Sequence, residues 1–316
     1  MENFALIGCG GYIAPRHMKA IKDTGNNLIA MLDPSDSVGI VDSYFPDAHF
    51  FTEFERFDRH VHKLSRGTKE ESVGFVAICS PNYLHDSHMR FALRSGAHAI
   101  CEKPLVLNPW NIDALEQIEH ETDRKVNSIL QLRVHPTVLT LRDEILKSDK
   151  HTKYDVDLTY VTSRGRWYLQ SWKGDTAKSG GIATNIGVHF FDMLYFLFGN
   201  VQSSQIYLSS AIKAGGFLEF ERARVRWYLS LDVTDVPPAA RDAGARTYRS
   251  ITVDGRDLEF SDGFADLHTR SYEEILAGRG FGLKDNRSAI EVVASIRSAE
   301  PTRAPADAHP LIRKSQ

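Results

Sequence analysis

The chain has 316 residues, of which 42% are hydrophobic and 25% charged, and its formal net charge is −3. A protein that binds nucleic acid mainly through phosphate contacts is expected to be clearly basic, so this balance argues against nucleic acid as a partner. No apolar run approaches the roughly 20 residues of a membrane span, and no basic segment precedes the first apolar run. We therefore expect no membrane partner and no signal peptide. Three cysteines are too few for a disulfide framework, which predicts a cytoplasmic protein.

The first 125 or so residues alternate short apolar runs with helical patterns. Expected strands lie at residues 4–7, 28–32, 75–79 and 98–101, and expected helices at 14–24, 82–94 and 108–122. Strands that are apolar on both faces and alternate with helices are typical of a parallel sheet covered on both sides. Residues 1–125 are therefore predicted to form an α/β domain with a doubly wound parallel sheet of the Rossmann type.

The pattern changes after Lys125. Residues 155–163 alternate polar and apolar side chains, as a strand with one covered face does. Further strands are expected at 126–134, 204–210, 222–233 and 249–253, and a helix at 136–147. We predict an α+β domain over 126–300, built on a largely antiparallel sheet, for substrate binding and oligomerisation. Residues 301–316 are rich in proline, alanine and charge, and are expected to be a flexible tail.

A glycine-rich loop follows the first expected strand and opens the first expected helix. Gly8 allows a tight turn, and Gly10 lets the backbone approach a pyrophosphate. The amide groups of Tyr12 and Ile13 then face its negative charge at the helix start. Ile13 stands where the fingerprint has its third glycine. Gly11 could take over part of the role of the third glycine, which is close packing of helix and strand. The loop therefore favours a dinucleotide site, although glycines also serve plain turns.

Asp33 ends the second expected strand. It follows Gly8 by 25 residues (33 − 8), close to the spacing of the acid that binds the ribose hydroxyls of a dinucleotide. A carboxylate there would repel a 2′-phosphate, so the sequence predicts NAD rather than NADP. The alternative is an ordinary Asp-Pro turn.

Two tripeptides, Ser80-Pro81-Asn82 and Glu102-Lys103-Pro104, follow expected parallel strands directly. Ligands of doubly wound sheets bind at these carboxyl ends. A surface turn explains the prolines, but it does not explain a lysine directly after a buried strand. Lysine in a partly desolvated cleft is suited to proton transfer. His85 and His88 are three residues apart, but no carboxylate or cysteine lies at a matching spacing, so we expect no metal site.

Two stretches of the second half are candidate parts of a site. In residues 179–199, His189 and Asp192 share a helical face, and on this pattern alone a hydrogen-bonded core histidine is the preferred interpretation. Residues 162–175 (TSRGRWYLQSWKGD) mix cations with aromatic residues. Arginine suits contacts with carboxylate or phosphate. A solvated basic loop is the alternative, but the aromatic residues favour a ligand site.

Taken together, four motifs resemble the Gfo/Idh/MocA oxidoreductase family. They are Gly-Cys-Gly-Gly, Ser-Pro-Asn-x-x-His, Glu-Lys-Pro and G-G-x-x-x-N-x-G-x-H-x-x-D, and they span residues 8 to 192. Longer stretches such as ICEKPLV, ILQLRVHP and VDLTYVTSRGRWYLQSWKGD are similar to the UDP-N-acetylglucosaminuronate 3-dehydrogenases of bacterial O-antigen (lipopolysaccharide) sugar biosynthesis. This resemblance implies oxidation of the C3 hydroxyl of UDP-N-acetylglucosaminuronic acid by NAD, giving a 3-keto sugar that an aminotransferase then converts.

The resemblance also implies roles for individual residues. Lys103 is the catalytic lysine, and His189 faces the sugar. Many members have aspartate where this chain has Asn185. Because an amide cannot act as a base, proton removal falls to Lys103 or His189, and Asn185 orients the hydroxyl.

The motifs and the resemblance give three sets of expected site residues. The catalytic residues are Lys103, Asn185 and His189. The cofactor contacts are Gly8, Gly10, Gly11, Tyr12, Ile13, Asp33, Ser80, Asn82, His85, Glu102, Lys103 and Gln131. The substrate contacts are Lys103, Arg164, Tyr168, Ser171, Trp172, Lys173, Thr184, Asn185 and His189. Arg166 and Arg133 are further cations that could contact substrate, and Arg133 could also contact nicotinamide.

Three alternatives stay open at this point. The protein could oxidise inositol, glucose or another free sugar, which needs no diphosphate site. It could be a non-catalytic NAD-binding regulator, although such a module needs neither Lys103 nor His189. It could also retain NADH and reoxidise it with 2-oxoglutarate, as some members of the subgroup do. The family commonly forms dimers or tetramers, and we expect a homotetramer.

Overall fold

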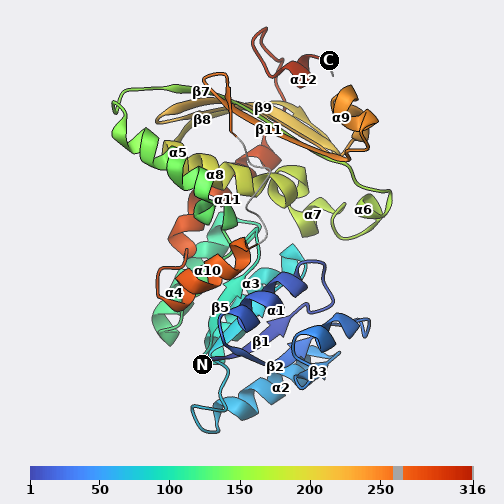
Figure 1. Ribbon diagram of the computed structural model, residues 1–316, viewed down its shortest axis with the longest axis vertical. Helices are drawn as coiled ribbons and strands as arrows, with labels where there is room; N and C mark the ends of the chain where they lie inside the picture. The colour runs from blue at the N-terminus through green and yellow to red at the C-terminus, as the bar shows by residue number, and fades with distance from the viewer. Residues whose placement is uncertain (259–265, 315–316) are drawn as a thin grey trace. The chain divides into compact units, whose positions relative to one another are not determined.

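The computed structural model describes residues 1–258 and 266–314, which form two compact units. Among these residues, unit 1 holds 1–134 and 266–287, and unit 2 holds 135–258 and 288–314 (Figure 1). The expected boundary after residue 125 is wrong, because the next strand and turn still belong to the first sheet. The segment from 266 to 287 was also expected in the second domain, but its helix packs on the first.

Unit 1 is built on a six-stranded parallel sheet with the order β3-β2-β1-β4-β5-β6. The strands are β1 (Asn3–Ile7), β2 (Asn27–Leu32), β3 (His49–Phe51), β4 (Phe75–Ile78), β5 (His98–Cys101) and β6 (Val126–Ser128). The order reverses between β1 and β4, and ligands of such sheets bind at this point. The predicted doubly wound sheet is therefore confirmed. The strand expected over 126–134 is shorter, because the chain turns at Gln131–Val134 (η3).

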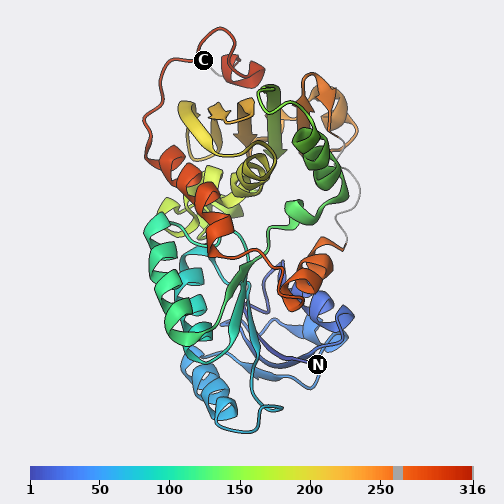
Figure 2. The same ribbon diagram turned by 90° about the vertical axis from the view of Figure 1, so that its left-hand side faces the viewer.

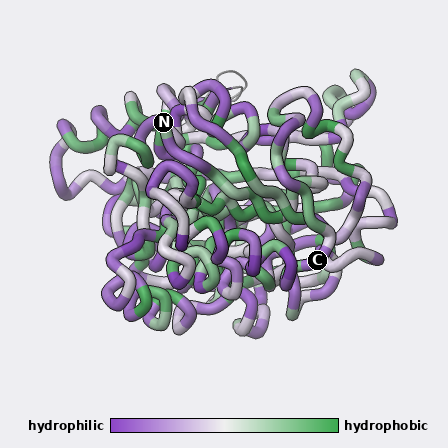
Figure 3. Tube along the Cα trace, turned by 90° about the horizontal axis from the view of Figure 1, so that it is seen from below, coloured by the Kyte–Doolittle hydropathy of each residue, from purple (hydrophilic) through white to green (hydrophobic). Residues whose placement is uncertain are grey.

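Helices cover both faces of this sheet. They are α1 (Ala14–Asp23), α2 (Phe54–Ser65), α3 (His85–Arg94), α4 (Pro109–Thr122) and α10 (Leu267–Leu276), with short turns η1 (Gly39–Ser43) and η2 (Asn82–Leu84). Figure 2 shows α3 and α4 on one side of the strands, and α1 and α10 on the other. The strands of β1 and β4 are almost wholly buried, and hydrophobic stretches run through the middle of the trace in Figure 3. Helix α11 (Leu283–Ser298) begins in unit 1 and ends in unit 2.

Unit 2 is built on a mixed sheet with the order β12-β11-β7-β10-β9-β8. The strands are β7 (Tyr154–Thr162), β8 (Val201–Ser209), β9 (Lys213–Phe220), β10 (Ala223–Ser230), β11 (Thr247–Val253) and β12 (Arg256–Asp257). Only β7 and β10 pair in parallel among the described strands of this sheet, so the largely antiparallel sheet is confirmed. Strand β9 was not expected, because Gly215 and Gly216 weaken its pattern. A Cβ on Gly216 would lie 2.2 Å from a main-chain oxygen of β8, so the close pairing requires glycine there.

Helices α5 (Pro136–Lys147) and α8 (Val188–Phe198) lie on one face of this sheet, and α12 (Pro310–Arg313) on the other (Figure 1). The shorter elements are α6 (Trp167–Gln170), α7 (Thr176–Ser179), η4 (Ala183–Gly187), η5 (Val233–Asp235) and α9 (Pro238–Asp242). By length and composition the helical stretch Thr176–Phe198 could cross a membrane, contrary to our expectation that no run approaches that length. However, 72% of its apolar window is buried inside the protein, which is the pattern of a core helix.

The C-terminal segment is packed on the second face of the sheet, so the flexible tail expected at 301–316 is wrong for its described part. The Thr302 amide donates to a main-chain oxygen of β8 at 2.8 Å. The ring of His309 lies 2.9 Å from the Thr159 hydroxyl, and the Ile312 side chain is fully buried. Buried apolar side chains within a proline-rich sequence therefore anchor the segment. Residues 315 and 316 lie outside the described part of the chain.

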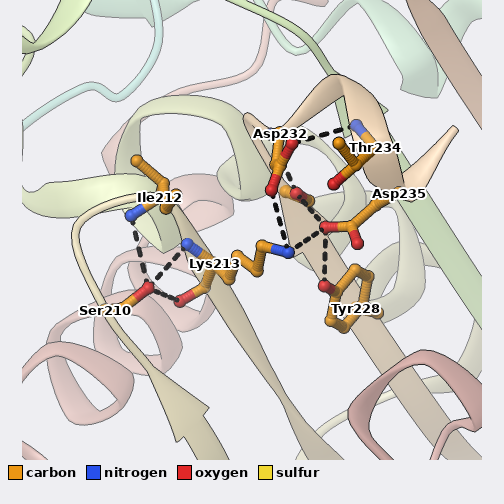
Figure 4. A network of polar contacts seen from close by, with 8 residues as sticks. Ser210, Ile212, Lys213, Tyr228, Asp232, Thr234 and Asp235 are labelled. Carbon is orange, nitrogen blue, oxygen red and sulfur yellow. Dashed lines mark hydrogen bonds and ion pairs between the residues drawn. The ribbon is translucent and has the colours of Figure 1, made fainter. Parts of the chain in front are cut away.

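A network of polar contacts joins the start of β9 to the end of β10 and the turn after it (Figure 4). The Lys213 Nζ lies 2.8 Å from an Asp235 oxygen and 3.2 Å from an Asp232 oxygen, and the Tyr228 hydroxyl donates to Asp235. Burial alone would lower the pKa of Lys213, but hydrogen bonds to Asp235 and Asp232 outweigh burial and raise the pKa. Lys213 therefore stays protonated and links the start of β9 to η5, the turn that follows β10.

Candidate active site

The glycine loop presses against the end of β4. Gly8 has φ +88°, and a Cβ there would lie 2.7 Å from the main-chain carbon of Cys79. Both facts require glycine at this position. Helix α1 begins shortly afterwards, and the amide groups of Tyr12 and Ile13 have no hydrogen-bond partner within residues 1–258 and 266–314. Amides at a helix start that are not used internally fit an anionic group such as a pyrophosphate.

Asp33 is joined to this loop. One of its carboxylate oxygens accepts a hydrogen bond from the Gly10 amide at 2.9 Å, and the other accepts one from the Ser35 amide at 2.9 Å. The predicted ribose acid thus lies beside the predicted pyrophosphate loop, at the end of the neighbouring strand. The residues present fit an NAD molecule. The Tyr12 side chain is 92% exposed, so it is available to cover a ligand.

Two histidines of α3, His85 and His88, contact Ser80 of the Ser-Pro-Asn loop. The Ser80 hydroxyl lies 2.8 Å from a ring nitrogen of His88, and burial lowers the pKa of His88 to about 4. The ring nitrogens of His85 lie 2.7 Å from the Pro104 carbonyl oxygen and 2.8 Å from the Ser80 carbonyl oxygen. His85 therefore ties this loop to the Glu-Lys-Pro loop. The ring is buried and both of its nitrogens are engaged within unit 1, while the expected contact of His85 with the cofactor stays a prediction.

Glu102 is held in place by two histidines. Its side chain is buried, and one carboxylate oxygen lies 2.9 Å from His17 Nε2 and 3.0 Å from His268 Nε2. The other oxygen accepts from the Lys103 amide at 3.2 Å. Burial alone would raise the pKa of Glu102, but the hydrogen bonds from both histidines hold it well below its usual range. With its carboxylate held by these three donors, Glu102 supports the Lys103 loop, and its contact with a cofactor stays a prediction.

Lys103 follows directly and is half-buried, between the fixed residues Glu102 and Pro104. The Lys103–Pro104 peptide is cis. Arg133, by contrast, is buried, and its guanidinium bonds to Asp285 at 3.2 and 2.8 Å. Arg133 therefore links η3 to α11, and its contact with nicotinamide or substrate stays a prediction.

In unit 2, Asn185 and His189 lie four residues apart and are both half-buried, whereas the side chains between them are buried. Asn185 belongs to a π-helical turn, η4, and such turns often occur at functional sites. Its amide nitrogen donates to the Tyr168 hydroxyl. Thr184, on the same turn, has a buried hydroxyl with no hydrogen-bond partner among the described residues. The structure thus brings together Tyr168 and Asn185, two of the predicted substrate contacts.

The loop after β7 combines positive charge with aromatic rings. The Lys173 Nζ lies 4.1 Å from the centre of the Trp172 ring. The Ser171 hydroxyl donates to the Tyr168 carbonyl at 2.9 Å, so this hydroxyl holds the loop itself. Burial raises the pKa of Tyr168, and Arg164 beside it is exposed. The loop therefore offers cations near a neutral, buried phenol.

Sequence reasoning missed His17 and His268. His17 lies on the apolar face of α1 with Met18 and Ile21, and a histidine on such a face is a weak signal by itself. His268 follows Glu102 by 166 residues, so no local motif connects them. Only the return of α10 to unit 1 brings the two histidines together.

Comparisons with known proteins agree with this geometry. The oxidoreductase family with an NAD-binding Rossmann fold, GFO_IDH_MocA, matches residues 2–129, and its C-terminal alpha/beta domain matches residues 151–232. The WlbA (WbpB) dehydrogenase from Thermus thermophilus is 50% identical, with a TM-score of 0.94 over 98% of this chain and 100% of that one. It has been solved with NAD and UDP-GlcNAcA, and with NAD and alpha-ketoglutarate.

More distant relatives share parts of this likeness. The WlbA dehydrogenase from Bordetella pertussis is 18% identical with a TM-score of 0.76, over 97% of this chain and 98% of that one, which shows the same fold. Glucose-6-phosphate 3-dehydrogenase of Bacillus subtilis (strain 168) is 23% identical over 63% of this chain. The chain spans about half the length of that curated relative, 54%. From the two domain matches and the Thermus likeness, the chain belongs to the Gfo/Idh/MocA family of oxidoreductases, whose Rossmann domain binds NAD.

Proposed function

We propose that this protein oxidises the C3 hydroxyl of UDP-N-acetylglucosaminuronic acid to a ketone with NAD, in the cytoplasm and as a step of O-antigen sugar biosynthesis. The observation that carries the proposal is the 50% identity over 98% of the chain to a dehydrogenase solved with NAD and UDP-GlcNAcA. Lys103 and His189, two residues suited to proton transfer, support it.

In unit 1, the glycine loop and Asp33 would hold NAD. Amides of the loop meet the pyrophosphate, and the Asp33 carboxylate meets the ribose hydroxyls. Bound NAD supplies the acceptor for the hydride that leaves C3. Since the Asp33 carboxylate is partly exposed at this place, a phosphate on the ribose would be repelled, and NAD is preferred to NADP.

The substrate hydroxyl must lose a proton as the hydride leaves, so a base within hydrogen-bond reach is required. Lys103 or His189 supplies it. Asn185 cannot, because its side chain is an amide. Its amide nitrogen donates to the Tyr168 hydroxyl, which fixes the side chain, and an amide oxygen is able to accept a hydrogen bond from the substrate hydroxyl. Asn185 then orients the hydroxyl towards the base.

The diphosphate and the sugar carboxylate need cationic partners. Lys173, Arg164 and Arg166 of the loop after β7 are exposed or half-buried, and they fit this requirement. Trp172, against which Lys173 lies, offers a flat apolar surface for a ring of the substrate. A free polyol would need none of these charges.

The test compares NADH formation with UDP-N-acetylglucosaminuronic acid, glucose 6-phosphate, glucose and myo-inositol at equal concentrations. The UDP-sugar should give the highest kcat/KM, and the product should be a 3-keto sugar by mass spectrometry. Activity with the free polyols alone would overturn the proposal. Lys103→Ala should retain NAD binding and lose turnover, with the exposed Lys69→Ala as the matched control. Undiminished turnover of the Lys103 variant would remove this lysine from the mechanism.

A second proposal concerns the fate of NADH. The Thermus relative was solved with alpha-ketoglutarate as well as NAD, which supports reoxidation of NADH by 2-oxoglutarate. Purified protein with the UDP-sugar, 2-oxoglutarate and a trace of NAD should then form 2-hydroxyglutarate in an amount equal to the ketone. We also propose a homotetramer, which light scattering of the full chain tests directly.

A further inference from the structure

A buried polar cluster lies behind the Lys103 loop, within unit 1. It consists of His17 from α1, Glu102 after β5, and His268 and Tyr272 from α10, and we call it the Glu102 cluster. All four side chains are buried. The two imidazoles meet edge to face, with ring centres 5.3 Å apart. The cluster therefore brings two helices, α1 and α10, to one carboxylate that follows β5.

Hydrogen bonds fix where the protons of the cluster lie. Ionised Glu102 can only accept, so the Nε2 atoms of His17 and His268 donate to it, at 2.9 and 3.0 Å. Burial lowers the pKa of His17, which is therefore neutral, and its Nδ1 accepts from the Tyr272 hydroxyl at 2.7 Å. The hydrogen bonds thus run in one direction, from Tyr272 to His17 and from His17 to Glu102, and His268 donates separately to the same Glu102 oxygen. Every ring nitrogen and carboxylate oxygen in these contacts has a matching partner.

Such an arrangement is costly to build for packing alone. Burying a carboxylate requires several strong donors to offset its lost hydration, and apolar side chains would fill the same space without that cost. The carboxylate also does one thing that an apolar side chain could not do. Its second oxygen accepts from the Lys103 amide at 3.2 Å. On the other side of Lys103, His85 holds the Pro104 carbonyl at 2.7 Å.

We propose that the Glu102 cluster is a positioning network for Lys103. The histidines hold the carboxylate, the carboxylate holds the Lys103 amide, and the lysine side chain thereby starts from a fixed backbone. His17, Glu102 and His268 are positioning residues in this scheme, since none of them has to touch the substrate. The inference rests on the proposed function in one respect, namely that Lys103 takes part in turnover.

Two imidazoles and a carboxylate also have the composition of a metal site, and their ligand atoms lie within 4.8 Å of one another. The two possibilities differ in one measurable property. A metal ion would take the Nε2 lone pairs of both histidines, whereas the network requires a proton on each Nε2. Nitrogen NMR of protein with ¹⁵N-labelled histidine, assigned with His17→Gln and His268→Gln, distinguishes the two. We expect a proton on Nε2 of both rings, in protein with no bound metal by elemental analysis.

The functional test uses two substitutions at His268, with the wild-type holoenzyme as reference. Glutamine places an amide N–H where Nε2 lies, so His268→Gln should keep kcat within about threefold. Leucine fills the space without a donor, so His268→Leu should lower kcat at least tenfold, since misplacing a catalytic group by about 1 Å can cost up to 100-fold. The Kd for NAD and the KM for the UDP-sugar should change little in both. Melting temperatures measured alongside show whether each variant is folded.

Each outcome decides the matter. Equal kcat in the leucine variant and the wild type overturns the inference and leaves the proposed function intact. Equal losses in both variants, or a stoichiometric metal ion, also overturn it. If the wild type itself does not oxidise the UDP-sugar, the proposed function fails, while the protonation of His17 and His268 is still tested by NMR because that measurement needs no substrate.

Discussion

His309 makes the packing of the C-terminal segment depend on pH. Its Nδ1 accepts a hydrogen bond from the Leu311 amide at 3.2 Å, which caps the start of α12. The ring proton of neutral His309 is therefore on Nε2, which donates to the Thr159 hydroxyl at 2.9 Å. The ring stacks on Tyr228, with centres 5.6 Å apart. Burial lowers the pKa of His309 to about 4; Asp157 opposes this, and Arg226 and Arg313 add to it. The packed segment therefore holds a neutral histidine that would be protonated at pH 5 in an unfolded chain.

The size of the effect follows from this difference. A histidine in an unfolded chain titrates near pH 6.5, and each pKa unit corresponds to about 1.36 kcal/mol. Because the folded pKa is lower, the stabilisation is complete above pH 6.5 and is lost as the pH falls towards 4. Between pH 8 and pH 5 the loss is about 2 kcal/mol.

The perturbation is His309→Asn, whose amide oxygen can still begin α12 but which does not titrate. Hydrogen exchange at the Thr302 and Ile312 amides, corrected for the intrinsic effect of pH, measures the free energy of opening at pH 8 and pH 5. From pH 8 to pH 5 the free energy of opening should fall by about 2 kcal/mol more in the wild type than in the variant. Other buried histidines are present in both proteins and cancel. The exposed His151→Asn serves as control, and parallel pH dependence of wild type and His309→Asn would refute the reasoning.

Three further predictions concern single side chains. Gly8→Ala should weaken NAD binding at least tenfold and lower the melting temperature, because a Cβ meets the main chain at 2.7 Å; Gly25→Ala, which has positive φ but no atom within 4 Å, should affect stability alone. Asp33→Ser should raise the ratio of kcat/KM for NADP to that for NAD, measured by steady-state kinetics, and an unchanged ratio would contradict the role of the carboxylate. Lys213→Met leaves Asp235 and Asp232 without their cation, so thermal unfolding should show a free energy of unfolding lower by about 1–3 kcal/mol. An unchanged melting temperature would argue against the network in Figure 4.

The sequence allowed the parallel sheet, the glycine loop and the Lys103 loop to be predicted, since each depends on residues that are neighbours in the chain. Local order also accounts for helix α4, which begins after Asn108 with Pro109 at its first position as expected. What could not be predicted depends on distant contacts. His17 and His268 reach Glu102 from 85 and 166 residues away. The buried partners of Glu102 and His85 could not be predicted either, because a motif gives a residue's place in the chain but not which way its side chain points.

The return of α10 to unit 1 has a consequence for synthesis of the chain. Residues 1–134 emerge from the ribosome first, yet His268 and Tyr272 are made only after most of unit 2. Until then the Glu102 carboxylate still has its hydrating water and lacks part of its set of hydrogen-bond donors. The inner face of α1 also lacks α10, the helix that covers it. Unit 2 is thus, over most of its length, an insertion within unit 1. A fragment that ends at residue 134 should behave as an incomplete domain, and the nascent enzyme should reach its final NAD-binding form only after α10 has been translated.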